Sequence, residues 1–176
     1  MAKQQETIDV DSTLVEIQSK TLFDRVSDYL TSKDWSFSAF PDKEYFSLGL
    51  RLTSGTTRII VDVSESPAWG RVLVYAIYPN FVPLNRRAEV SEAINRVNYT
   101  LIFGNLEMDL KDGEIRVRAV LESDTFVSEQ MIDRAVRKSI DLADQYQAAI
   151  LAIAFGNVGA QGILELAERA DDATLQ

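Results

Sequence analysis

The amino-acid sequence predicts an α+β domain in which about five antiparallel strands form one sheet and helices pack on it, in the order α-β-β-β-α-β-β-α. Two patterns lead to this prediction. Apolar and polar residues alternate along residues 44–52 and 106–119, as in strands with one buried face, and apolar residues recur at helical spacing along residues 21–33, 86–99 and 128–155. With 176 residues and 46% hydrophobic content, the chain can bury one sizeable core.

The two ends of the chain differ in character from its middle. Residues 1–18 are polar and acidic and are predicted to form an N-terminal arm. Residues 19–157 hold the α+β domain, and residues 158–176 are expected to form a short C-terminal helix followed by an acidic tail. Gly156, Gly159 and Gly162 are expected to end the long helix that precedes them.

Three helices are predicted within the domain from their apolar stripes and from residues that can cap their first turns. The first covers residues 21–33 with Thr21 as its cap, and the second is capped by Asn85 and runs from residue 86 to about 99. The third is capped by Ser128 and runs to about Phe155. Residues 34–42 form either a connector or a first short strand, and the other strands lie between the helices.

The strand predicted at residues 71–78 is apolar on both faces. Such a strand lies inside a sheet that is covered on both sides, or it has one side buried in an interface. The second case makes the strand, together with Phe81 just after it, a candidate interaction surface, whose residues are Val72, Val74, Tyr75, Tyr78 and Phe81. The alternative is that its aromatic side chains simply belong to the core.

Residues 106–119 predict a β-hairpin together with its register. If Asp112 and Gly113 occupy a two-residue type I′ turn, Lys111 lies opposite Glu114. The charged face then pairs Asp109 with Arg116 and Glu107 with Arg118, and the other face is apolar. Because a slip of one residue would turn the apolar set to water, the pattern specifies which face is buried.

Composition excludes several classes of function. The chain has no cysteine and no histidine, which removes disulfides, thiolate chemistry, the commonest general base and the commonest transition-metal ligand. Its net charge of −9 repels phosphate backbones and anionic membrane surfaces, so neither nucleic acid nor a membrane is expected as a partner. The first residues lack the apolar core of a signal peptide, and a cytoplasmic protein without a cofactor is expected.

One set of residues, from the second predicted helix through the hairpin, forms a signature: Asn95, Asn98, Leu101, Gly104, Asp109, Gly113 and Arg116. These residues resemble the central signature of the YbjN family, and the likeness extends over roughly residues 20–157. Members of this family are described as bacterial sensory transduction regulators with a fold similar to type III secretion chaperones. The resemblance therefore implies that fold and a cytosolic, non-enzymatic role, and it supplies no catalytic residues.

Charged and amide side chains near the hairpin offer candidate binding sites, each with a structural alternative. Glu107 and Asp109 share a strand face and could hold a metal, but the arginines opposite them favour ion pairing. Asn95 and Asn98 share a helix face. Side-chain amides in such places more often tie down backbone than recognise a partner, so both are expected to be structural.

Two functions remain. The favoured one is a non-enzymatic protein-binding module, chaperone-like or a regulatory adaptor, whose protein or peptide partner the sequence does not identify. The alternative is a sensor or enzyme for a small ligand or metal that uses carboxylates, for example Asp62 with Asp109. The strand that is apolar on both faces also predicts a homodimer.

Overall fold

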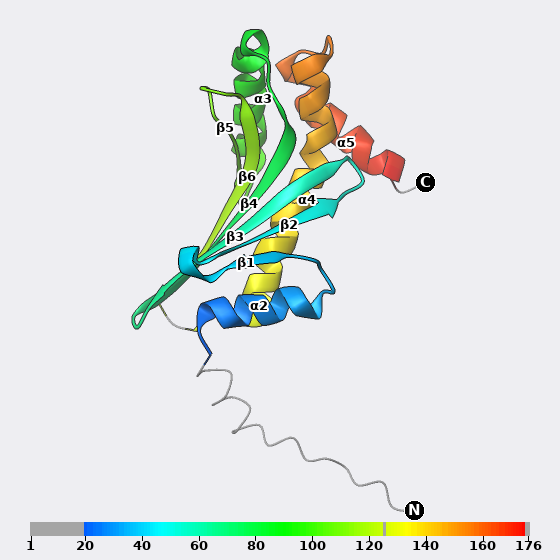
Figure 1. The fold of residues 1–176 in the computed structure, drawn as a ribbon. Coiled ribbons are helices and arrows are strands. Elements are labelled where there is room, and N and C mark those ends of the chain that lie inside the picture. Colours follow the sequence, from blue (N-terminus) through cyan, green and yellow to red (C-terminus); the bar gives the residue numbers. More distant parts are fainter. Residues whose placement is uncertain (1–19, 125, 175–176) are drawn as a thin grey trace, which may run out of the picture.

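The computed structural model describes residues 20–124 and 126–174, and the arm predicted at residues 1–18 lies outside them. Six antiparallel strands form one sheet in the order β1-β2-β3-β4-β6-β5, and the long helix α4 packs along one of its faces (Figure 1). This architecture confirms the predicted α+β class. The sheet has one strand more than the five expected, because residues 38–40 pair with the next strand instead of forming a connector.

The bounds of the elements follow the predicted order closely. The described helices are α2 (Leu22–Ser32), α3 (Arg87–Thr100), α4 (Glu129–Phe155) and α5 (Ile163–Thr174). The strands are β1 (Ser38–Phe40), β2 (Tyr45–Arg51), β3 (Thr56–Ser66), β4 (Trp69–Phe81), β5 (Asn105–Met108) and β6 (Glu114–Ser123). Helix α5 extends to Thr174, so it includes most of the segment that was expected to be a tail.

The core lies between the sheet and the helices on one of its faces. In the central strand β4, Val72, Val74 and Ala76 are fully buried, while the residues between them are only partly buried. Tyr78 lies on the buried face as well, and its hydroxyl donates to the backbone oxygen of Ala143 in α4 at 3.0 Å. Alternation along each strand therefore separates a face packed on helices from a face turned away from them.

Two of the three expected helix caps are confirmed. The side chains of Thr21 and Ser128 accept hydrogen bonds from the backbone N–H groups of Asp24 and Met131, respectively. The cap expected from Asn85 is wrong, because residues 84–86 form a 3-10 turn and α3 begins only at residue 87 without a side-chain cap.

The register predicted for the β5–β6 hairpin is wrong by two residues. Glu107, not Asp109, lies opposite Arg116, and Leu106 lies opposite Val117. The turn has four residues, 110–113, closed by hydrogen bonds from Asp109 N–H to the Glu114 oxygen (2.9 Å) and from Gly113 N–H to the Asp109 oxygen (2.7 Å). Because the error is an even number of residues, each side chain still lies on the predicted face.

A distant arginine explains why the longer turn forms. A type I′ turn needs positive φ at both central residues, but only Gly113 has it here, with φ of 91°. The guanidinium of Arg87 donates to the backbone oxygens of residues 110, 111 and 112 at 2.7–3.1 Å and to that of Val82 at 3.1 Å. It thereby ties three successive turn carbonyls to the start of α3, a contact that the local sequence does not encode.

Replacing Gly113 by alanine is expected to destabilise the protein by at least about 2 kcal/mol. The alanine would have to adopt the positive φ of this position, and its Cβ would lie 2.3 Å from the backbone oxygen of Val82. Gly49→Ala is the matched control, since its Cβ would meet no atom within 4 Å, and its effect should stay within about 1 kcal/mol of zero. Urea unfolding of both variants measures the difference. Equal destabilisation by the two would contradict this account of the turn.

Candidate functional site

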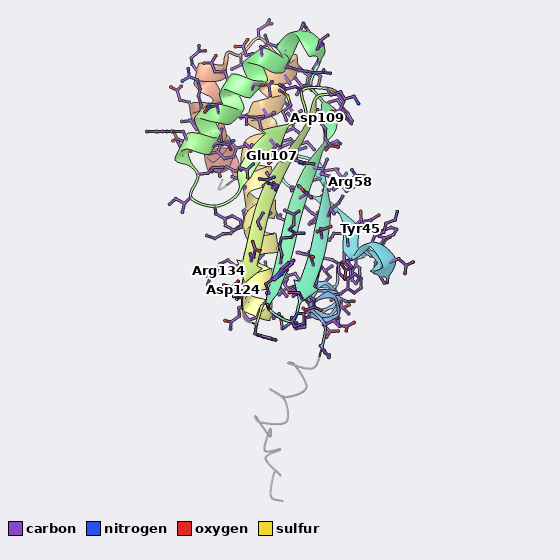
Figure 2. The ribbon with its side chains drawn as sticks, turned by 90° about the vertical axis from the view of Figure 1, so that its left-hand side faces the viewer. Tyr45, Arg58, Glu107, Asp109, Asp124 and Arg134 are labelled. Atoms are coloured by element: carbon purple, nitrogen blue, oxygen red, sulfur yellow. The ribbon has the colours of Figure 1, made fainter. Side chains whose placement is uncertain are left out.

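The face of the sheet turned away from the helices is the candidate site, and we call it the open face. Figure 2 looks onto the sheet with α4 behind it. The cross-strand register places Ile60 beside Tyr75 and Tyr75 beside Arg118 on this face. Its central residues are Tyr45, Arg58, Ile60, Leu73, Tyr75, Ile77, Arg116, Arg118 and Val120. An apolar strip thus crosses the middle strands, with arginines beside it.

Arginines on the open face are held in place by one carboxylate. Glu107 in β5 forms an ion pair with Arg116 at 3.0 Å, with a hydrogen bond from Arg116 Nε, and lies 3.0 Å from Arg118 Nε. The second contact is an ion pair without hydrogen-bond alignment. Asn105 also donates to Glu107 at 3.0 Å, and the guanidinium of Arg116 stacks over the Tyr75 ring at 4.4 Å.

The charge state of Glu107 follows from these contacts. Partial burial opposes its ionisation, but hydrogen bonds from Asn105 and Arg116, together with the charges of Arg118 and Arg116, outweigh burial and lower its pKa. The lowered pKa favours the ionised carboxylate, which offsets one of the two positive charges of Arg116 and Arg118. Its role is to orient Arg116 against Tyr75, which gives this part of the open face a fixed shape.

The structure divides the five residues that the sequence suggested as an interaction surface. Val72, Val74 and Tyr78 are 0%, 0% and 2% exposed and belong to the core, so they offer no accessible surface. Tyr75 lies on the open face, and Phe81 is 53% exposed at the end of β4. The neighbours Ile60 and Leu73, which are partly exposed on the open face, were missed. The signal that could have found them is that each alternates along its strand with buried apolar residues.

Asn98, one of the signature residues, protects the edge of the sheet. Its side-chain amide donates to the Leu106 backbone oxygen and accepts from the Leu106 N–H, both at 2.9 Å. The side chain thus occupies the position of a further strand at the outer edge of β5. Asn95, by contrast, is exposed on α3.

The remaining signature residues shape the hairpin. Gly104 and Gly113 have positive φ, and a Cβ on Gly104 would lie 3.2 Å from the Arg118 backbone oxygen. Asp109 accepts a hydrogen bond from the Lys111 N–H within the turn and does not face Arg116 as predicted. Arg116 is the one signature residue whose side chain lies on the open face.

The carboxylates proposed for a ligand or metal do not converge. Asp62 lies in β3 and Asp109 follows β5, so β4 and β6 separate them by roughly 14 Å or more. Burial raises the pKa of Asp62, partly offset by Arg71, whose guanidinium lies 4.0 Å away. Across residues 20–124 and 126–174, no three acidic side chains form a group that could hold a metal ion.

Within the same part of the chain, no helix combines the length and apolar composition needed to cross a membrane.

The fold and the open face together define a class: a small α+β protein whose sheet is covered by helices on one side only. The family model YbjN, described as "Putative bacterial sensory transduction regulator", matches residues 22–152, and the chain belongs to this family. This confirms the family resemblance read from the signature residues.

A solved structure is also similar. It is a crystal structure of YbjN, described as "a putative transcription regulator from E. coli", at 14% sequence identity and a TM-score of 0.55. The match covers 75% of this chain and 91% of that chain. At this identity the likeness shows the fold alone. No curated protein matches the chain.

Asn98→Ala is expected to destabilise the protein by about 1–3 kcal/mol, because it leaves the Leu106 N–H and carbonyl without partners at a partly buried edge. Asn95→Ala on the same helix is the control and should change stability by less than about 0.5 kcal/mol. Thermal and urea unfolding of both variants provide the comparison, and an equal loss would show that Asn98 does not hold the edge.

Glu107→Gln is expected to lower stability most above pH 4.5, the ordinary pKa of the carboxyl group. Because the folded-state pKa is lowered, the ionised Glu107 stabilises the fold above its unfolded pKa, and this contribution disappears as pH falls through the folded value. Unfolding curves over a pH series should show the gap between wild type and variant closing in acid. If the stability difference between the wild type and Glu107→Gln persisted well below the folded-state pKa of Glu107, the stabilising role given to its ionised form would be wrong.

Proposed function

We propose that this protein is a non-enzymatic, cytoplasmic regulator that works by binding a protein chain on its open face. The observation that carries the proposal is the mixture of side chains there: Ile60 and Leu73 lie beside Tyr75, with Arg116 stacked on its ring. Aromatic residues and arginine are the types most enriched at the energetic centres of protein interfaces.

The rigidity of this face supports the same proposal. Arg116 is held by Glu107 and stacks on Tyr75, so less side-chain entropy is lost when a partner covers it. The face also lies on a sheet of six strands, which offers another protein an extended surface. The family description as a regulator supports a role without catalysis.

The alternative function, a carboxylate-based sensor or enzyme, has less support. Its named pair, Asp62 and Asp109, lies at separate parts of the sheet, and Glu107 is engaged by two arginines. Likeness to type III secretion chaperones, implied by the family resemblance, stays a prediction. It would agree with a protein partner but is not required by the present proposal.

We further propose that the open face can pair with a second copy of the chain. Arg58, Arg71 and Arg118 share this face with Asp62 and Glu122, so the face carries both signs of charge. A two-fold dimer places the same patch against itself, and such a mixed pattern can be complementary to itself. This is the homodimer expected from the sequence.

Tyr75→Glu is expected to abolish dimerisation, because it introduces a charge at the centre of the apolar strip and removes the ring beneath Arg116. Tyr99→Glu is the matched control, since Tyr99 is 92% exposed on α3, away from the open face. Light scattering after gel filtration should give twice 19.7 kDa for the wild type and control, and 19.7 kDa for Tyr75→Glu. A wild-type mass of 19.7 kDa at micromolar concentration would reject the homodimer.

The same pair of variants tests partner binding. In crosslinking pull-downs from the native cytosol, proteins retained by the wild type should also be retained by Tyr99→Glu and lost with Tyr75→Glu. Circular dichroism checks that both variants fold. If the wild type retains no protein above background, or if Tyr75→Glu retains the same set, the open face is not the binding surface.

A further inference from the structure

A second surface, on the helical side of the molecule, has a different character from the open face. A groove of about 1040 Å³ runs between α2 and the first half of α4, and we call it the basic groove. Six of its lining residues are basic: Lys20, Arg25, Lys33, Arg134, Arg137 and Lys138. Figure 2 labels Arg134 at the end of the molecule where α4 begins.

The charge of the groove is opposite to that of the chain. Its six basic residues face the three carboxylates of Asp28, Glu129 and Asp133, and Arg25 also pairs with Glu65 at 3.8 Å, which leaves an excess of two positive charges. The whole chain has only 18 basic residues and a net charge of −9, so one third of its cations line this single groove. Such a local reversal of sign attracts anionic groups that the rest of the surface repels.

The acidic residues of the groove neutralise only part of it. Lys20 pairs with Asp28 at 2.8 Å, and Asp133 pairs with Lys33 at 3.0 Å and Arg137 at 2.8 Å. Hydrogen bonding from Arg137 outweighs desolvation and, with Lys33, lowers the pKa of Asp133, so this carboxylate stays charged and committed to its two cations.

The excess positive charge therefore lies further along α4. Arg134 is exposed and forms no ion pair with a described carboxylate, and the ammonium group of Lys138 lies 5.5 Å from the centre of the Phe103 ring. Both side chains are available to an incoming anion.

The spacing of these cations indicates the shape of the ligand. From Ser128 to Lys138, α4 rises roughly 15 Å, about the length of five extended residues. On α4 the cations Arg134, Arg137 and Lys138 lie within roughly 6 Å of helix rise, and the other three basic residues line the α2 side, so positive charge lies on both walls of the groove. Phe126, stacked under Arg25 at 4.3 Å and 38% exposed, adds an apolar contact at one end.

We propose that the basic groove binds an acidic segment of a partner protein in an extended conformation. Carboxylates of the segment lie along Arg134 and Lys138, and an apolar side chain of the segment contacts Phe126. The proposal goes beyond the function assigned to the open face, because the groove is formed by α2 and α4 on the other side of the sheet. It can therefore be tested independently of dimerisation.

The test uses the full chain and a fluorescein-labelled peptide, Asp-Glu-Leu-Asp-Glu-Phe-Asp-Glu, in a polarisation assay. The double variant Arg134→Glu, Lys138→Glu should bind it at least about tenfold more weakly than the wild type, since two attractive contacts become repulsive. Arg96→Glu, Lys43→Glu is the matched control, which changes the net charge equally at exposed sites outside the groove and should bind nearly as well as the wild type. Wild-type binding should also weaken with added salt.

Several results would overturn the proposal. One is that the wild type, the double variant and the control bind the peptide with equal affinity. Another is that the control loses as much affinity as the double variant. A third is that the wild type binds equally well a peptide in which Asn and Gln replace Asp and Glu. Binding of ATP but not of the peptide would assign the groove to a small anion. Peptide binding seen only after deletion of residues 1–18, whose net charge is −3, would make that segment the occupant instead.

Discussion

The structure depends above all on the packing of helix α4 against the sheet. This one helix contacts β3, β4 and β6 as well as the other helices, and polar contacts fix its position along its length. Near its middle, Asp144 accepts hydrogen bonds from the backbone of the β2–β3 turn, including one of 2.7 Å from the Ser54 N–H. Near its end, the Ile153 carbonyl accepts from Arg86, just before α3. Helix α4 packs on the central strands, and α2 and α3 lie on β3 and β5, so the buried valines are covered from one side and the other side stays accessible.

Most of the fold could be predicted because it is encoded locally. Alternation identified the strands, and the short polar residues Thr21 and Ser128 identified two helix starts. The β5–β6 turn could not be predicted, because an Asp-Gly pair permits a two-residue turn, whereas Arg87, more than twenty residues earlier, binds the carbonyls of a four-residue turn. A contact between distant residues thus overrode a local preference, and the register moved by two residues without changing the buried face.

The candidate site was harder to predict than the fold for a related reason. In β4, both the even-numbered and the odd-numbered residues are apolar, so the sequence cannot tell which set meets the helices. That choice depends on register with β3 and β6 and on the side where α4 packs. Val72 and Val74 therefore looked equivalent to Tyr75 in sequence, although only Tyr75 lies beside the arginines of the open face. The basic groove was missed because its cations come from α2 and α4, more than a hundred residues apart.

The two surfaces complement each other physically. On the open face, carboxylates accompany the arginines, so contact there depends mainly on apolar and aromatic area, which salt affects little. In the basic groove two positive charges are unbalanced, so long-range attraction acts there and is screened by salt. For a chain with a net charge of −9, an acidic partner can approach with least repulsion along the groove. A partner held there would leave the open face uncovered, so the two surfaces can be occupied at the same time, and a regulator built this way can join two chains without any catalytic step.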